Sequence, residues 1–312
     1  MRPRHALMLA LLSGVWGASY LLIAEAIEEI PESLVVFART GLAALALLVV
    51  IRVRGGAAPG LLADARRRPG TALLLGLFAI ALPFMLITFG ERTVPSGLSA
   101  VLIASAPIFI AILAPFLDRS EMMSPVQWCG LVVGLGGVGL LVGVEQIGSA
   151  GELLGAAAMI GAAASYAVSG FILKLRYAGV PPIVTTLFSV GAAAILTLPA
   201  AVAQPPDAAP GPVAVLAVVA LALVGTAWAF VVYFRLIAEI GYGRASVVAY
   251  TIPPVALAYG WALRDEPVTG ATVAGMLLIL VGVFLVARGG RVGFRRSISA
   301  NPPLPQQTDT LR

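Results

Sequence analysis

Apolar runs of about 20 residues recur along the chain and are separated by short polar or Pro/Gly-rich breaks. A helix needs about 20 mostly apolar residues to cross the hydrocarbon core of a bilayer. Apolar stretches such as 73–75 and 277–280 do not alternate in polarity, as the strands of a membrane barrel would. The pattern therefore predicts an all-α integral membrane protein with ten transmembrane helices. Their approximate positions are 6–24, 34–52, 71–90, 96–117, 125–144, 153–173, 182–202, 213–234, 243–263 and 269–287.

Basic residues are divided unevenly between the two sets of loops that these ten crossings define. With a cytoplasmic N-terminus, the cytoplasmic segments hold 17 of the 20 Lys and Arg residues, whereas the outer loops hold Arg92 and Arg264. Cytoplasmic loops of membrane proteins carry such an excess. We therefore expect a multi-pass protein of the cell (inner or plasma) membrane with both termini in the cytoplasm. A cleaved signal peptide in the first run is the alternative, and it would leave nine helices.

Composition excludes several classes of protein. Only 11% of the residues are charged and 60% are hydrophobic, whereas a soluble domain carries about 25% charged residues. The chain has one histidine, His5, in the expected N-terminal tail, and one cysteine, Cys129. A His/Cys metal site or a serine–histidine relay cannot be assembled from these residues. We therefore expect no catalytic residue, no metal, no cofactor and no nucleic-acid partner.

The chain is similar to itself at two offsets. At an offset of 150 the matched pairs are Trp16 with Tyr166, Pro31 with Pro181 and Gly41 with Gly191. At an offset of 145 they are Glu121 with Glu266, Gly130 with Gly275 and Gly137 with Gly282. We therefore predict two five-helix repeats, 1–148 and 149–290. Because five is odd, the halves enter the membrane from opposite sides, an inverted repeat typical of secondary transporters that bind substrate near the midplane.

Short motifs in a fixed order accompany this repeat over about residues 5–288. They are 14–19, 37–40, 104–109, 117–121, 130–143, 164–167, 250–254, 263–266 and 275–282. In this respect the chain resembles the ten-helix, EamA-type members of the drug/metabolite transporter superfamily. The resemblance implies two EamA-like repeats and a carrier, often an exporter, of small organic solutes such as amino acids, metabolites or drugs. It also implies a central cavity lined mainly by helices 1, 3, 4, 6, 8 and 9.

Prolines occur at corresponding places in the two halves. Pro107 falls in the fourth predicted helix, and Pro253 and Pro254 fall in its repeat mate, the ninth. A proline frees a backbone carbonyl, which is tolerated at membrane depth only inside protein or beside a wet cavity. Broken helices at matching positions indicate a transporter site, although ordinary kinks are the alternative. Ser105 and Tyr250, repeat mates just before these prolines, are therefore expected on the cavity.

Arg39 is the only charge clearly inside a predicted span. A guanidinium there can hold a substrate carboxylate or phosphate. Alternatively, it extends to the outer interface or pairs with an acid in 25–29. Trp16, Tyr20 and Tyr166 carry rings with a polar group, which suit an amphipathic solute, with helix packing as the alternative. These four residues complete the set of cavity candidates.

Glycines and acids refine this interpretation. The glycines of 130–143 follow no strand, so we interpret them as close helix packing, within the chain or in a homodimer, and not as a nucleotide loop. No Asp or Glu lies at mid-span, and Glu25 and Glu91 are the nearest candidates for proton coupling. The tail 291–312 is basic and then Pro-rich, and we expect it to be disordered on anionic cytoplasmic lipid.

The sequence thus predicts a membrane transporter and not an enzyme. By family analogy we expect export of a small organic solute through alternating access around a midplane cavity between the two repeats. Its expected partners are that solute and the lipid bilayer. The alternatives are a polytopic membrane enzyme acting on lipids and a membrane sensor or scaffold.

Overall fold

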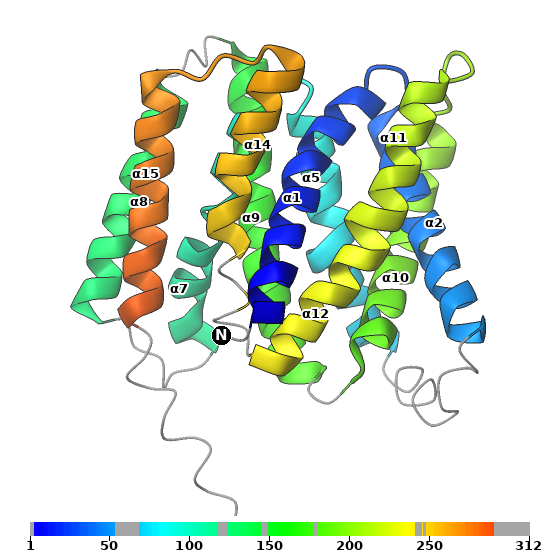
Figure 1. Ribbon diagram of the computed structural model, residues 1–312, viewed down its shortest axis with the longest axis horizontal. Coiled ribbons are helices and arrows are strands. Elements are labelled where there is room, and N and C mark those ends of the chain that lie inside the picture. The colour runs from blue at the N-terminus through cyan, green and yellow to red at the C-terminus, as the bar shows by residue number, and fades with distance from the viewer. Residues whose placement is uncertain are drawn as a thin grey trace, which may run out of the picture.

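The computed structural model describes residues 3–53, 69–117, 124–144, 149–177, 180–240, 245 and 248–289, and its regular elements there are all helices (Figure 1). The first half contains α1 (Pro3–Ala26), α2 (Glu32–Val53), α4 (Pro69–Gly76), η1 (Leu77–Ala81), α5 (Leu82–Gly90), α6 (Ser96–Ile103), α7 (Ala106–Leu117) and α8 (Pro125–Val144). The second contains α9 (Ala150–Arg176), α10 (Pro182–Ala203), α11 (Pro212–Ala222), η2 (Leu223–Trp228), α12 (Ala229–Ile240), α14 (Val248–Arg264) and α15 (Gly270–Gly289).

Within these ranges the elements form ten helical rods, because α4–η1–α5, α6–α7 and α11–η2–α12 each follow one predicted span. Six rods are long and apolar enough to cross a membrane, and three shorter apolar helices accompany them. Large apolar side chains such as Leu45, Val132 and Phe284 are exposed on the outside of the bundle. In a bilayer this exposure is favourable, since lipid is the solvent there. The predicted all-α membrane fold is therefore confirmed. The predicted disordered tail, 291–312, lies outside the described residues.

Helix packing follows the predicted repeat. The fifth helix α8 packs on its mate α15, and the second helix α2 packs on its mate α10. Likewise α1 packs against α14, and in the other half the corresponding helix α9 packs against α6 and α7. In Figure 1 the pair α8 and α15 forms one edge of the bundle, while α2 lies at the opposite edge. These contacts between the halves are thus symmetric, as two related repeats would produce.

Glycines bring α8 and α15 into backbone contact. A Cβ added to Gly282 would lie 2.5 Å from the Gly134 nitrogen and 2.6 Å from the Gly130 oxygen. A Cβ added to Gly137 would lie 2.8 Å from the Gly275 oxygen. Small residues of this kind allow close approach in lipid, where packing and not water exclusion holds helices together. The predicted packing role of these glycines is therefore confirmed within the chain.

Interruptions of the helices differ from the prediction. The fourth rod is interrupted at 104–105, between α6 and α7. In contrast, Pro253 and Pro254 lie inside the continuous helix α14, so the predicted break there is wrong. A proline removes only its own amide donor, and the remaining hydrogen bonds carry the helix past it with at most a kink. The third and eighth rods instead contain the π-helical segments η1 and η2, at corresponding places in the two halves.

The α8–α15 contact gives a matched pair of substitutions. Gly282→Ala should destabilise the protein by about 1–3 kcal/mol, because backbone atoms of α8 must move away from the new methyl group. Gly136→Ala should have little effect, since nothing lies within 4 Å of the position of its added Cβ. The free energy of unfolding of both variants can be measured in detergent with increasing amounts of SDS. Equal stability of the two would contradict the described contact.

Candidate functional site: a cavity between the two halves

A cavity of about 180 Å³ lies between the two halves of the bundle. It is lined by Trp16, Ser19, Tyr20, Ile23, Arg39, Leu75, Ala79, Phe84, Ile87, Ile103, Ala106, Ile110, Tyr166, Ser169, Gly170, Leu173, Phe230, Tyr233, Phe234, Val248, Ala249 and Ile252. The lining helices are the six that the family resemblance implies, with α2 added through Arg39. Among the described residues, the packed pair α8 and α15 contributes none to the lining. The cavity is therefore a largely apolar, aromatic site of the kind that binds small organic molecules.

The residues that line the cavity occupy equivalent positions in the two halves. Four residues of α1 line the cavity at helical spacing, and their mates at an offset of 150 on α9 all line it too. The pairs are Trp16 with Tyr166, Ser19 with Ser169, Tyr20 with Gly170 and Ile23 with Leu173. On the third and eighth rods, Phe84 and Ile87 correspond to Phe230 and Tyr233 at a common offset of 146. The two repeats thus contribute equivalent walls to one shared site.

Arg39 breaks this symmetry. It is the charged residue of the lining, and only 4% of its surface is exposed. Its Nε donates a hydrogen bond of 2.6 Å to Oγ1 of Thr226, and its Cζ lies 3.9 Å from the centre of the Phe84 ring. No carboxylate of the described residues lies within ion-pair distance of it. Its repeat mate Ser189 is buried and donates to the Thr185 carbonyl. The structure thus supports neither of the two alternatives to a cavity position, extension to the interface or pairing with the 25–29 acids.

The π-helical segment η2 organises the polar part of the cavity. Thr226 on this segment donates to the Leu221 carbonyl at 2.8 Å, which directs its oxygen to accept from Arg39. The Gly225 carbonyl accepts a hydrogen bond of 3.2 Å from Nε1 of Trp16. Single-turn π segments are frequent at functional sites because they re-aim backbone and side-chain groups. Sequence reasoning missed Thr226, because no residue type marks a π segment.

The remaining predicted residues are placed as follows. Tyr20 and Tyr166 line the cavity beside Trp16 and Arg39. Ser105 is not among the lining residues: it is 1% exposed and donates at 2.6 Å to the Leu102 carbonyl, which corrects its expected cavity position. Its backbone amide donates to the same carbonyl at 3.1 Å, so both donors of Ser105 are turned back onto the end of α6. Tyr250 lies on α14 and Pro107 on α7, but their side chains lie outside the described part of the chain. Substrate contact by any of these residues stays a prediction.

Polar links join the halves at the end of the bundle where α1 finishes, which we call the upper end. Arg264, the last residue of α14, binds Glu25 at 3.0 Å and Glu28 at 2.6 Å. Glu266 accepts hydrogen bonds of 3.0 Å from the amides of Ser96 and Gly97, and so caps the N-terminus of α6. Each link connects a segment of the second half to one of the first.

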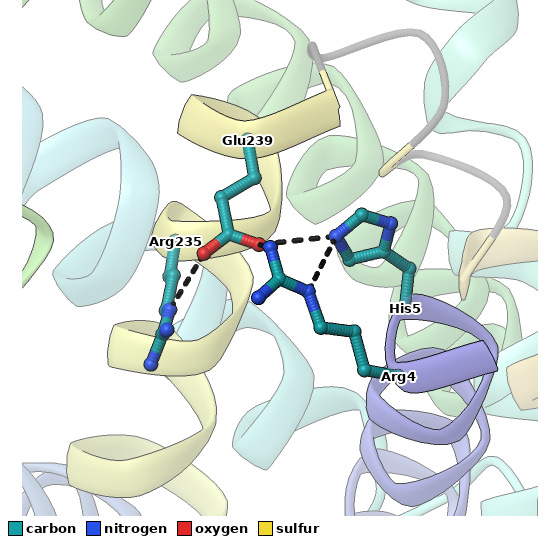
Figure 2. Close-up of polar contacts among 4 residues, drawn as sticks. All are labelled: Arg4, His5, Arg235 and Glu239. Atoms are coloured by element: carbon teal, nitrogen blue, oxygen red, sulfur yellow. Dashed lines mark hydrogen bonds and ion pairs between the residues drawn. The ribbon is translucent and has the colours of Figure 1, made fainter. Parts of the chain in front are cut away.

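A second polar cluster joins the halves where α1 begins, which we call the lower end (Figure 2). Glu239 of α12 binds Arg4 at 3.2 Å, Nε2 of His5 at 3.1 Å and Arg235 at 2.8 Å. His5 belongs to α1 and is 6% exposed, so its predicted place in a tail is wrong. The reason is that α1 extends below the apolar run, where Glu239 gives the ring a polar partner. Both ends of the bundle therefore carry ionic contacts between the two halves.

Comparison with known proteins agrees with this architecture. The model of the EamA-like transporter family matches residues 4–143 and 153–288. The uncharacterized transporter YoaV of Bacillus subtilis is 26% identical over 87% of this chain and 92% of its own length. A protein of Streptantibioticus cattleyicolor named "Probable terminal-alkyne amino-acid exporter" is 31% identical over 69% of this chain and 71% of its own length.

Further similarity comes from another transporter and from a solved structure. The uncharacterized inner membrane transporter YedA of Escherichia coli is 26% identical over 88% of each chain. A crystal structure with a TM-score of 0.67 covers 93% of this chain and 100% of its own, at 21% identity, and so shares the fold. The two family matches together span nearly the whole chain, and the described residues form a bundle of ten helical rods. The chain therefore belongs to the EamA-like transporter family.

Proposed function

We propose that this transporter carries a small carboxylate with an apolar side chain across the cell membrane. The observation that carries the proposal is Arg39, a buried cation in a cavity whose other walls are mainly apolar and aromatic. A guanidinium has five N–H donors, and the hydrogen bond to Thr226 uses one of them. The remaining donors suit the two oxygens of a carboxylate. Phe84, stacked on the guanidinium, holds its plane in the cavity.

An amino acid is the solute that fits these features best. The apolar wall of Ile103, Ile110 and Ile252 suits an aliphatic side chain. The ring faces of Trp16 and Tyr166 suit an ammonium group, since a cation is attracted to an aromatic face. A relative bears the name of an amino-acid exporter, which supports both the solute class and export as the direction.

The ionic contacts at the two ends support a mechanism of alternating access. In this proposal each set of contacts restricts access to the cavity from its own end. We propose that each set opens once in a transport cycle, so that the cavity faces the two solutions in turn. The excess of arginine in the predicted cytoplasmic loops supports a cytoplasmic position for the lower end, which carries Arg4.

Substitution of Arg39 tests the proposed substrate class. Arg39→Gln should raise the apparent KM for L-leucine about 10- to 100-fold, because a charge-assisted contact with the carboxylate is lost. Counterflow of radiolabelled L-leucine in proteoliposomes measures it. Arg176→Gln is the matched control, since Arg176 is an exposed arginine at the end of α9. An unchanged KM in Arg39→Gln would show that the cation does not bind the solute.

Substitution of Glu239 tests the lower end. Glu239→Gln weakens the contacts to Arg4, His5 and Arg235, so conformations open at this end should become more populated. In a Cys129→Ser background, a thiol reagent should label Ala249→Cys, on the cavity wall, about two- to fivefold faster. Glu28→Gln, which weakens the upper end, should not accelerate labelling from the cytoplasmic side. Equal labelling rates with and without Glu239→Gln would contradict a closing role for this cluster.

A further inference from the structure

Glu91 is a buried acid one helical turn beyond the cavity, toward the upper end of the bundle. It follows the last residue of α5, and its amide donates a hydrogen bond of 2.9 Å to the carbonyl of Ile87. Residues four apart share one face of a helix, so Glu91 lies one turn above Ile87, which lines the cavity. Its side chain is 8% exposed, and neither carboxyl oxygen has a hydrogen-bond partner among the described residues. A buried, unpartnered carboxylate is costly, and such a group usually takes up a proton.

The charged and titratable groups around Glu91 do not compensate its charge. Tyr20 of α1 and Arg39 of α2 face it from the cavity, and Arg264 and Glu266 face it from the upper end. Arg264 already binds Glu25 and Glu28, and Arg39 donates to Thr226 and has no described carboxylate, Glu91 included, within ion-pair distance. The α9 residues packed on the neighbouring Gly90 are uncharged. Burial, and next the negative charge of Glu266, raise the pKa of Glu91 well above its usual range, against the weaker lowering by Arg39, Arg264 and the nearby backbone amide of Ala24.

We propose that Glu91 is a proton-binding site of the carrier, which takes up a proton when the upper end closes over it and releases the proton when that end opens. The proton adds to a carboxylate oxygen from the solution at the upper end, and Glu91 ionises again when water reaches it. No other group changes its bonding. The inference rests on the proposed transport function, and it makes solute movement depend on protons.

The sign of the pH dependence follows from the two conformations. The pKa of Glu91 is higher when the upper end is closed than when it is open, because water solvates the carboxylate in the open conformation. Protonation therefore stabilises the closed upper end below the pKa of the open state, and this contribution is lost as the pH rises through the raised pKa. Acid thus favours a cavity that is reached from the lower end. A glutamine at position 91 imitates the protonated carboxyl group and should remove this dependence.

Infrared spectroscopy tests the proton site without a substrate. In proteoliposomes of the full chain, pH-difference spectra should contain a protonated-carboxyl C=O band that persists above the titration range of exposed glutamates. Glu91→Gln should abolish the band. Asp207→Asn should keep it, because Asp207 is an exposed acid that belongs to neither ionic cluster. A band that is absent from the wild type, or unchanged in Glu91→Gln, would overturn the proposal.

Transport measurements test the coupling separately. Counterflow of L-leucine by the wild type should vary with pH by up to about tenfold per unit, the limit for a single proton. Glu91→Gln should flatten this profile while it retains exchange, and Asp207→Asn should leave it unchanged. A wild-type pH profile retained by Glu91→Gln would overturn the coupling. If the wild type moves no L-leucine, the proposed solute is refuted, whereas the infrared band still decides the proton site.

Discussion

A guanidinium buried at membrane depth is the constraint on which the arrangement of this site depends. A charge in the membrane is costly unless polar groups meet it. Arg39 is met by the Thr226 hydroxyl and by the face of Phe84. Thr226 can reach it because η2 locally departs from α-helical geometry in the eighth rod. The same segment binds Trp16 through the Gly225 carbonyl, so one irregular turn positions both the charge and the central aromatic ring.

The scaffold is symmetric, while the residues that carry chemistry are not. Four positions of α1 and their four mates on α9 line the cavity together. Arg39 has the buried Ser189 as its mate, and at the offset of 146 that relates the third and eighth rods Glu91 corresponds to Ile237. In the proposed transport cycle, equivalent walls allow the two halves to exchange roles as the cavity changes its accessible side. Arg39 and Glu91, both in the first half, allow the two sides to differ in what they bind.

Sequence alone predicted the helical rods well, because a bilayer imposes apolar length on every crossing. It also identified Trp16, Tyr20, Arg39 and Tyr166, which the structure brings together around one cavity. It could not find η2, since a π segment has no residue signature, and so it missed Thr226.

Other errors came from local rules that the surrounding structure overrides. Proline at 253 and 254 predicted a break, but the rest of α14 remains hydrogen-bonded and continuous. Ser105 was expected on the cavity from its register, whereas the interruption beside it turns its hydroxyl to the Leu102 carbonyl. His5 was assigned to a tail because its ionic partner, Glu239, is 234 residues away in sequence. The isolation of the Glu91 carboxyl likewise depends on three-dimensional packing.

The most direct test of one cavity shared by the two halves and open to each side in turn is cysteine accessibility. Ser169→Cys lies on the cavity wall and Ser189→Cys is buried on α10; both are made in a Cys129→Ser background. A membrane-impermeant thiol reagent is then added to oriented vesicles from one side or the other. The account predicts that Ser169→Cys reacts from both sides and Ser189→Cys from neither. Reaction of Ser169→Cys from a single side under all conditions, or equal reaction of the two cysteines, would contradict it.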